Sequence, residues 1–342
     1  MTSLSAALIL TLLLLGPLAV QALERNLEAY CLILGLIAVT LSGQWNRPLL
    51  AQMASAPVPI TLAVVVAGLA FARFRPALER GFARLREAIS RSLLTALAII
   101  AIGLASCLIS AIVGALLLVE AIGKLRLGPP VRNNVAVAGC FAIGLGSALT
   151  PAGGPFSAIV AHGLDLRFFD LLRLLGAWLI PGIAVSGALA AWFARGDYDF
   201  IAEEMAVRER ARDVVFQGAK IFAFVAGLTL IGAAYGPLAA RWIPRFGPSL
   251  LFWGNTLSAA LDNATLAALE THGMTPVHLR PALLSMVISG GMLIPGNIPN
   301  IVCAGILEIR SVEWARIGVP IGVAMLGICF ALLFAMLAFG GV

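Results

Sequence analysis

The chain has 342 residues, of which 61% are hydrophobic and only 12% are charged, and its mean hydropathy is +1.00. A water-soluble globular domain of this length does not tolerate such a balance, so the composition excludes a soluble protein and predicts one whose solvent is mostly lipid. The formal net charge of +6 does not indicate a nucleic-acid partner, because all but two of the 23 basic residues are arginines scattered between apolar runs.

Long apolar runs follow one another along the chain. A bilayer core about 30 Å thick needs roughly 20 apolar residues per helical crossing, so these runs predict an all-α polytopic membrane protein. The first run is predicted to be an uncleaved helix, since no basic segment precedes it and another apolar run follows directly. The runs cover residues 5–23, 28–43, 57–73, 93–122, 133–163, 170–193, 215–238, 249–270, 281–307 and 317–340.

Two polar stretches divide the chain into predicted domains. Residues 73–91 are rich in arginine, with apolar residues at helical spacing, which predicts an amphipathic helix on a cytoplasmic face. Residues 195–214 mix arginines with carboxylates, as a solvated cytoplasmic linker helix does. The predicted domains are N-terminal transmembrane helices over 1–56, a first repeat over 57–194, the linker over 195–214 and a second repeat over 215–342.

The repeats are predicted from internal similarity. Residues 110–122 align with 258–270, and TPAGGPFS at 150–157 aligns with IPGNIPNI at 294–301, each with two prolines four residues apart. The distribution of Lys and Arg over the loops fits parallel and inverted halves almost equally well. Inverted halves with re-entrant hairpins are favoured, because a polar tip at membrane depth is tolerated only where protein or a water-filled cavity covers it.

In each repeat, a hairpin is predicted to precede a transmembrane helix that Pro and Gly break. The hairpins cover about 93–122 and 249–270, and the broken helices cover 133–163 and 281–307. Proline removes a backbone donor and clashes with the preceding turn, so each helix opens and leaves backbone groups for a ligand. The alternative is an ordinary proline kink. The polar side chains at the breaks are Thr150, Ser157, Asn297 and Asn300.

Asp262 is the most informative single residue, because it lies within the apolar stretch LSAALDNATLAAL. A carboxylate near the bilayer centre costs about 2.5–3.5 kcal/mol, so such a residue is usually functional. Asp262 is expected to bind Na⁺ or a proton, with help from Asn263, Thr265 and Asn255. The alternative is a carboxylate at a helix end that reaches the interface or caps the next helix. Glu120 is either a second titrating group or an interfacial anchor.

Enzyme chemistry has little support in the sequence. Ser147 and the later His162 are a weak sign of an intramembrane hydrolase, and neither an H-E-x-x-H nor a Walker sequence is present. The cysteines lie far apart inside apolar runs without a C-x-x-C pair, so they are predicted to be small core residues. They are Cys31, Cys107, Cys140, Cys303 and Cys329. We therefore expect no enzyme and no cofactor.

Residues 93–163 and 249–307 resemble, in this order, the two repeats of the ion transporter superfamily, which includes D-type Na⁺/H⁺ antiporters, arsenite permeases and dicarboxylate/Na⁺ symporters. Asp262-Asn263 is similar to the Asp-Asn hairpin tip of the antiporters, and Gly291 through Asn300 is similar to their Gly/Asn-containing break. Gly144 through Pro155 resembles their Gly-rich stretch ending in T-P-x-G-x-P. The symporters carry Ser-Asn-Thr at both tips, which 110–117 lacks, so the resemblance argues against a dicarboxylate substrate.

Together, the residues and the resemblance predict a multi-pass transporter of a bacterial or archaeal inner membrane. The expected activity is exchange of a cation, Na⁺ first, for protons by alternating access. Asp262, Asn263 and Asn297 are the Na⁺ ligand candidates. The main alternative is a Na⁺-coupled symporter of a small organic or inorganic anion, with helix N-termini holding the anion. Expected partners are the bilayer, the cation and the proton; a homodimer is one option, since relatives that the chain resembles are often dimers.

Overall fold

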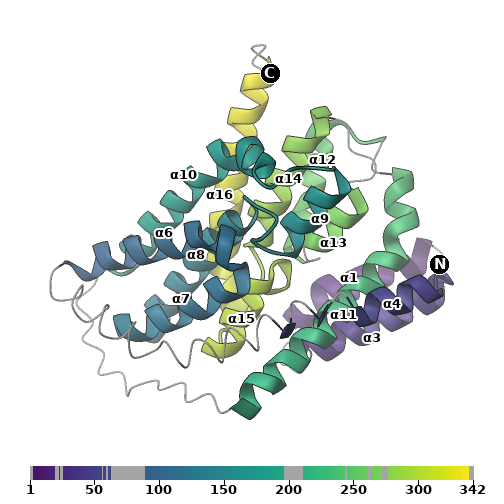
Figure 1. Cartoon of the computed structure of the whole chain (residues 1–342), viewed down its shortest axis with the longest axis horizontal. Helices are drawn as coiled ribbons and strands as arrows, with labels where there is room; N and C mark the ends of the chain where they lie inside the picture. Colours follow the sequence, from purple (N-terminus) through teal and green to yellow (C-terminus); the bar gives the residue numbers. More distant parts are fainter. Residues whose placement is uncertain are drawn as a thin grey trace. The chain divides into compact units, whose positions relative to one another are not determined.

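The computed structural model describes residues 3–19, 23, 26–55, 57–58, 61–62, 89–195, 211–242, 245–260, 263–270 and 276–338. Within these ranges the chain is helical and has no β-strand, which confirms the predicted all-α class. In chain order (Figure 1), the elements are α1 (Ser3–Ala19), α3 (Leu27–Ser42), α4 (Arg47–Ser55), α6 (Arg91–Ile109), α7 (Ala111–Leu125), α8 (Pro129–Ser147), α9 (Pro155–Gly163), α10 (Asp170–Phe193), α11 (Ala211–Trp242), α12 (Pro248–Gly254), the 3₁₀ turn η2 (Asn255–Ala259), α13 (Asn263–Glu270), α14 (Pro276–Gly290), the 3₁₀ turn η4 (Ile294–Gly296), α15 (Ile298–Leu307) and α16 (Ser311–Ala338).

Three predicted segments lie mostly outside the described residues. The amphipathic helix predicted over 73–91 is described only from residue 89 onward. Most of the apolar run 57–73 and residues 196–210 of the linker predicted over 195–214 also lie outside. These predictions stay predictions.

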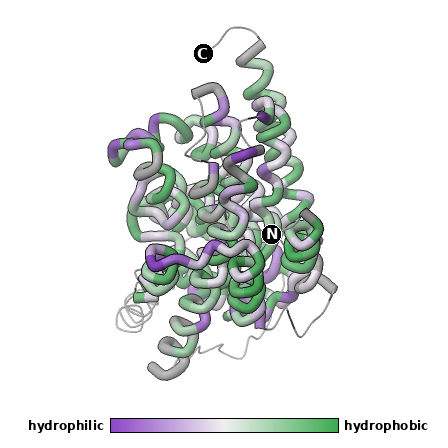
Figure 2. Tube along the Cα trace, turned by 90° about the vertical axis from the view of Figure 1, so that its right-hand side faces the viewer, coloured by the Kyte–Doolittle hydropathy of each residue, from purple (hydrophilic) through white to green (hydrophobic). Residues whose placement is uncertain are grey.

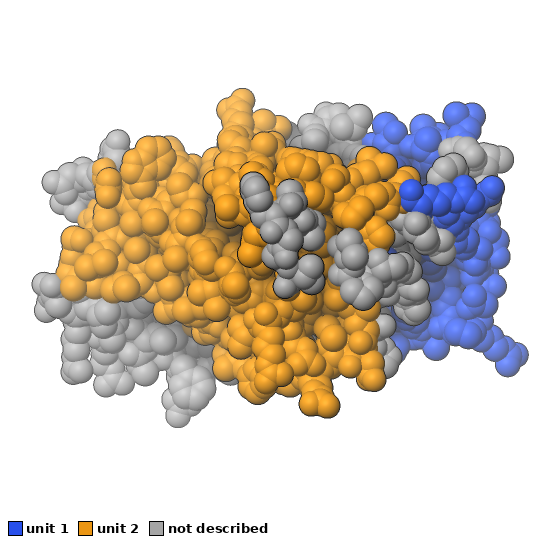
Figure 3. Space-filling model, turned by 90° about the horizontal axis from the view of Figure 1, so that it is seen from above, with its two compact units in different colours: residues 1–73, 207–245, 268–273 blue, residues 74–206, 246–267, 274–342 orange. Residues whose placement is uncertain are grey.

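The chain forms two compact units, which are coloured separately in Figure 3. Unit 1 comprises Met1–Arg73, Val207–Arg245 and Ala268–Gly273, and unit 2 comprises Phe74–Ala206, Phe246–Ala267 and Met274–Val342. Helix α11 therefore groups with the N-terminal helices, although it falls inside the second repeat as the sequence delimits it.

In unit 1, α11 packs along α3 and also contacts α4. The approach of α3 to α11 is close enough for glycines to meet: a Cβ added at Gly35 would lie 2.5 Å from the carbonyl oxygen of Gly227. Small residues permit such backbone contact between apolar helices. The Tyr235 hydroxyl donates a hydrogen bond of 2.6 Å to the carbonyl oxygen of Ala6 and so ties α11 to α1.

The first half of unit 2 begins with α6 and α7, which pack against each other and join at Ser110. Helix α7 runs antiparallel to α8: a Cβ at Gly139 would lie 2.6 Å from the Leu118 side chain, and one at Gly114 would lie 3.2 Å from Ile143. Helix α6 also contacts α8, and both of these helices contact α10. The turn between α6 and α7 therefore lies near the C-terminal end of α8.

The second half of unit 2 pairs the 3₁₀ turn η2 with α14 through side-chain hydrogen bonds. The Asn255 side-chain amide donates to the carbonyl oxygen of Ala282 at 3.4 Å, and the Ser258 hydroxyl donates to that of Met286 at 3.1 Å. Residue numbers rise together along both elements, so η2 runs parallel to α14. Helix α16 then packs against α14 and α8.

Among the described residues, three helices are long and apolar enough to cross a membrane: Arg91–Ile109, Asp170–Phe193 and Ser311–Met336. The second coincides with the predicted run 170–193. Figure 2 shows hydrophobic residues along much of the described trace. Helix α16 exposes Ile328 (63%), Leu332 (55%) and Met336 (53%) at a spacing of four residues, a stripe that a soluble helix would bury. These features indicate a membrane protein.

Candidate functional site

The first break separates α8 from α9 at residues 148–154. The Thr150 hydroxyl donates to the carbonyl oxygen of Cys107 in the last turn of α6. The amide of Ala111, the first residue of α7, donates to the carbonyl oxygen of Gly153 at 2.8 Å. The break therefore forms hydrogen bonds with residues on both sides of the turn between α6 and α7, so the turn and the break lie next to each other.

The predicted ligands Thr150 and Ser157 are both buried beside this break. The Ser157 hydroxyl donates to the carbonyl oxygen of Gly154 at 3.0 Å. Each hydroxyl therefore donates its one hydrogen bond to a backbone carbonyl, which leaves its oxygen lone pairs as acceptors. Both residues are suited to bind a cation or a hydrogen-bond donor.

The second break separates α14 from α15 at residues 291–297. Asn300 is fully buried, and its side-chain amide nitrogen donates to the carbonyl oxygens of Gly290 and Leu293, both at 2.8 Å. The indole of Trp314 donates to the carbonyl oxygen of Gly291 at 3.2 Å. These side chains replace the backbone donors that the break has removed.

Asn300 also presents an acceptor to the site. Its two donations fix the orientation of the amide, and its Oδ1 atom is buried without a hydrogen-bond partner among the described residues. An unsatisfied buried carbonyl oxygen costs about 1–3 kcal/mol, so a ligand that satisfies it gains a comparable amount. A cation or a donor group is the chemistry that fits.

Residues of η2 and α13 lie against the same break. A Cβ at Gly296 would lie 2.7–2.8 Å from the carbonyl oxygens of Ala259 and Ser258, and one at Gly290 would lie 3.3 Å from Asn263 Nδ2. The Ser289 hydroxyl fastens η2 to α14 through the carbonyl oxygen of Asn255, at 2.9 Å. The structure thus brings the predicted residues Asn263, Asn297 and Asn300 together around one break, whereas the Asn255 side chain bonds to the carbonyl oxygen of Ala282, about two turns before the break. Asp262 lies outside the described residues, as does the side chain of Thr265.

The two breaks meet through α8 and α15. A Cβ at Gly144 would lie 2.7 Å from Asn297 Nδ2, so the side chain at the second break occupies the space that glycine leaves on α8. The Cys140 thiol donates to the carbonyl oxygen of Pro299 at 3.5 Å, and the Arg132 guanidinium donates to that of Leu307 at 3.0 Å. Residue numbers fall along α8 as they rise along α15, so the two helices are antiparallel.

Helix α7 is therefore parallel to α15, since both run antiparallel to α8. The Cys303 thiol donates to the carbonyl oxygen of Ala115 at 3.6 Å, and one turn back from this contact both helices begin. The N-terminal ends of α7 and α15, which carry positive partial charge, thus lie at similar depth. Ser110 precedes α7 with φ 73° and ψ 153°, and its Oγ is buried without a hydrogen-bond partner in the described part of the chain. Such backbone strain costs about 1–3 kcal/mol and is concentrated at functional sites.

A model of a protein family matches residues 3–336, and its description is "Protein of unknown function (DUF1646)". The chain belongs to this family. No curated protein matches the chain. The match spans both breaks and both units, so the DUF1646 family model covers the whole candidate site.

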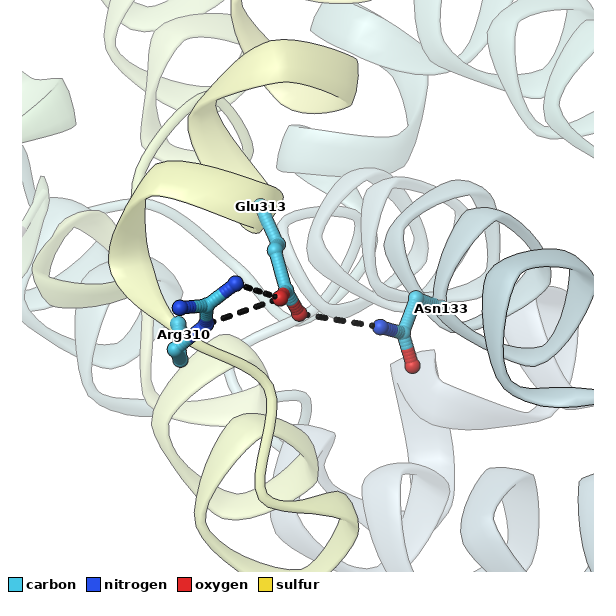
Figure 4. Close-up of polar contacts among 3 residues, drawn as sticks. All are labelled: Asn133, Arg310 and Glu313. Atoms are coloured by element: carbon cyan, nitrogen blue, oxygen red, sulfur yellow. Dashed lines mark hydrogen bonds and ion pairs between the residues drawn. The ribbon is translucent and has the colours of Figure 1, made fainter.

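A polar cluster in the DUF1646 chain that the sequence did not predict ties α8 to the start of α16 (Figure 4). The Asn133 amide donates to Glu313 Oε2 at 3.2 Å, and Arg310 Nε donates to Glu313 Oε1 at 2.8 Å. Beside it, Arg132 caps the C-terminal end of α15 through Leu307. Burial lowers the pKa of the Arg132 guanidinium from its usual value, and the negative charges of nearby Glu308 and Glu313 oppose this shift.

The Glu120 side chain lies at neither break. Its carboxylate lies 3.5 Å from Lys124 Nζ, near the C-terminal end of α7 and away from the helix start where Ser110 lies. This position favours the anchor over a second titrating group. The residues of the hydrolase alternative also gain no support, because the Ser147 hydroxyl donates to the carbonyl oxygen of Gly144 at 3.0 Å and the His162 side chain lies outside the described part.

The described residues also contain no cluster of the side chains that usually bind metal ions. In the described ranges, no group of three or more His, Cys, Asp or Glu side chains could hold a metal ion. The ligands at the breaks are instead neutral oxygens of Asn, Ser and Thr side chains and of the backbone. Such oxygens suit a hard monovalent cation when a carboxylate completes the shell.

Proposed function

We propose that this DUF1646 protein is a secondary active transporter that exchanges a monovalent cation, with Na⁺ as the first candidate, for protons by alternating access. The observation that carries the proposal is the unpartnered Oδ1 of Asn300, which is fully buried between two broken helices. Acceptor oxygens of Asn297 and Thr150, and the carbonyl groups of Ser258 and Ala259, lie around the same two breaks.

The proposal includes two inverted repeats with re-entrant hairpins. The antiparallel course of α8 and α15 supports inversion, because parallel halves would make the two broken helices run the same way. The turn at Ser110 supports re-entrance: α6 reaches the depth of the first break and α7 returns from it. Irregular backbone at this depth is tolerated where protein or a cavity covers it.

Asp262 supplies the proton chemistry in this proposal. It precedes Asn263, whose side chain lies against the second break. Deprotonated, Asp262 completes a cation shell that otherwise contains only neutral oxygens; protonated, it is neutral and releases the cation. Binding of the cation and binding of the proton then exclude each other, which is the coupling that antiport requires.

The test is Na⁺-driven proton flux in proteoliposomes that contain a pH-sensitive dye. Adding Na⁺ outside acid-loaded vesicles should make the lumen alkaline with the unchanged protein and with the control Asp170→Asn, whose carboxylate pairs with Arg173 at 3.2 Å near the surface. Asp262→Asn should abolish the response. Full Na⁺-dependent flux in Asp262→Asn would show that this mechanism is wrong.

A second candidate, a Na⁺-coupled symporter of a small anion, is favoured by one observation. The N-terminal ends of α7 and α15 lie side by side, and helix N-termini attract anions. Electrogenic, Na⁺-dependent uptake of a labelled carboxylate without luminal alkalinisation would favour the symporter. Alkalinisation without such uptake would favour the antiporter. Location in a bacterial or archaeal inner membrane and assembly as a homodimer are part of the same proposal.

A further inference from the structure

Cys140 and Cys303 are distant in sequence and come together in unit 2. Cys140 lies in α8, Cys303 lies in α15, and both are fully buried. The Cys140 thiol lies 3.5 Å from the carbonyl oxygen of Pro299, the residue one helical turn before Cys303. Helices α8 and α15 contact each other, so the two cysteines lie on facing stretches of these helices.

The hydrogen bonds of these thiols are weak. Cys140 and Cys303 donate at 3.5 Å and 3.6 Å to carbonyl oxygens of Pro299 and Ala115 that lie within helices. Backbone amides one turn further along already bond to such carbonyls, and S–H is a weak donor. Replacing the two thiol protons by another cation thus leaves the helix backbone satisfied.

The pair also lies next to the breaks. Cys140 is one turn from Gly144, whose neighbour is Asn297, and Cys303 lies three residues after Asn300. A desolvated cation that reaches the oxygen groups at the break is one helical turn from two sulfur ligands. Harder ions prefer the oxygens, whereas soft ions prefer thiolates.

We propose that Cys140 and Cys303 form a two-coordinate site for a thiophilic metal ion that bridges α8 and α15. A divalent soft ion binds as M²⁺ + 2 RSH → M(SR)₂ + 2 H⁺: two metal–sulfur bonds form, two S–H bonds break, and no electron is transferred. The product is neutral, which suits a buried site, because burying a net charge is costly. Among the described residues no third Cys, His or carboxylate joins the pair, so four-coordinate zinc does not fit.

The test uses Hg²⁺ as the probe and the full-length protein in detergent, in a variant where Cys31, Cys107 and Cys329 are changed to Ala so that only the pair remains. X-ray absorption at the mercury edge should find two sulfur neighbours for one ion per chain. The ion should also resist a wash with a monothiol. Adding Cys140→Ala or Cys303→Ala should leave one sulfur neighbour and speed loss of the ion about 100-fold or more, the order expected when a two-point attachment becomes a single one.

Two results would overturn the site. One is a single sulfur neighbour, or no bound ion, when both cysteines are present and circular dichroism shows native helix content. The other is unchanged retention of Hg²⁺ after removal of either cysteine. As a matched control, Cys329→Ala alone, in the otherwise unchanged chain, should leave the retained ion in place. Binding is measured without transport, so failure of the proposed antiport activity does not affect this outcome, and failure here leaves that activity standing.

Discussion

Three glycines of unit 2 allow a graded test of helix packing around the candidate site. Gly123, Gly144 and Gly146 are helical residues whose surroundings differ. Alanine favours a helix over glycine by about 1 kcal/mol, so each Gly→Ala change starts from the same gain. The steric consequence of the added methyl group then decides the result.

Each site predicts a different outcome. Nothing lies within 4 Å of a Cβ at Gly123, so Gly123→Ala should stabilise the protein by up to about 1 kcal/mol. A Cβ at Gly144 would lie 2.7 Å from Asn297 Nδ2, the end of a side chain that is able to rotate away. Gly144→Ala should therefore change stability by less than about 1 kcal/mol but displace Asn297. A Cβ at Gly146 overlaps the carbonyl oxygen of Gly103, which cannot rotate away, so Gly146→Ala should destabilise by about 3 kcal/mol or more.

Thermal unfolding in one detergent, followed by circular dichroism, ranks the three variants. Sodium-dependent proton flux in proteoliposomes then separates Gly144→Ala, which should lose activity while remaining folded, from Gly123→Ala, which should keep both. Full flux in Gly144→Ala would show that Asn297 has no part in the site. Equal stability of Gly146→Ala and Gly123→Ala would contradict the close contact between Gly146 and Gly103.

Further predictions concern the side chains that complete the broken backbone. Asn300→Ala should destabilise by about 2–4 kcal/mol, because two buried carbonyl groups lose their donor; chemical unfolding measures this. Trp314→Phe should cost about 1 kcal/mol by removing the donor to Gly291 while keeping most of the ring, and thermal unfolding checks it. Arg132→Ala should cost about 1–3 kcal/mol, because the carbonyl of Leu307 loses a charged donor; hydrogen exchange should show faster fraying at the end of α15.

Matched substitutions distinguish these effects from general damage. Arg126→Ala removes an arginine that is exposed at the end of α7, and Trp192→Phe alters a ring that is 59% exposed. Both should change stability by less than about 0.5 kcal/mol. Equal losses in Arg126→Ala and Arg132→Ala, or in the two tryptophan variants, would contradict the assigned contacts.

The sequence predicted those helix bounds and helix breaks that depend on neighbouring residues in the chain. The run 170–193 has the bounds of α10, because uninterrupted apolar sequence and helix formation coincide there. Helices α8 and α14 end at Ser147 and Gly290, just before the Pro/Gly segments, because Pro and Gly residues close together disfavour a helix. A single proline does not suffice, since α14 continues through Pro281. Asn297 and Asn300 were candidates because polar residues beside such segments are rare in apolar sequence.

Contacts between halves had no local signal. Cys140 and Pro299 are 159 residues apart, and Arg132 and Leu307 are 175 apart. Cysteine spacing predicted separate core residues, and Arg132 is one of many arginines scattered between apolar runs. The space that Gly144 leaves for Asn297 also depends on how α8 meets α15. A single sequence does not report such pairings, which arise only from tertiary packing.

The segment between α14 and α15 is held in place by side-chain hydrogen bonds and is not free to act as a hinge. Asn300 spans it from one side and Trp314 from the other, so its carbonyl groups have donors without any change of shape. Closing the gap into continuous helix would break three hydrogen bonds that are already made. Movement during a transport cycle therefore has to carry this segment along intact. The amides of Gly291, Met292 and Gly296, which donate to the carbonyl oxygens of Ile288, Ser289 and Leu293, should then exchange with solvent slowly in every state of that cycle.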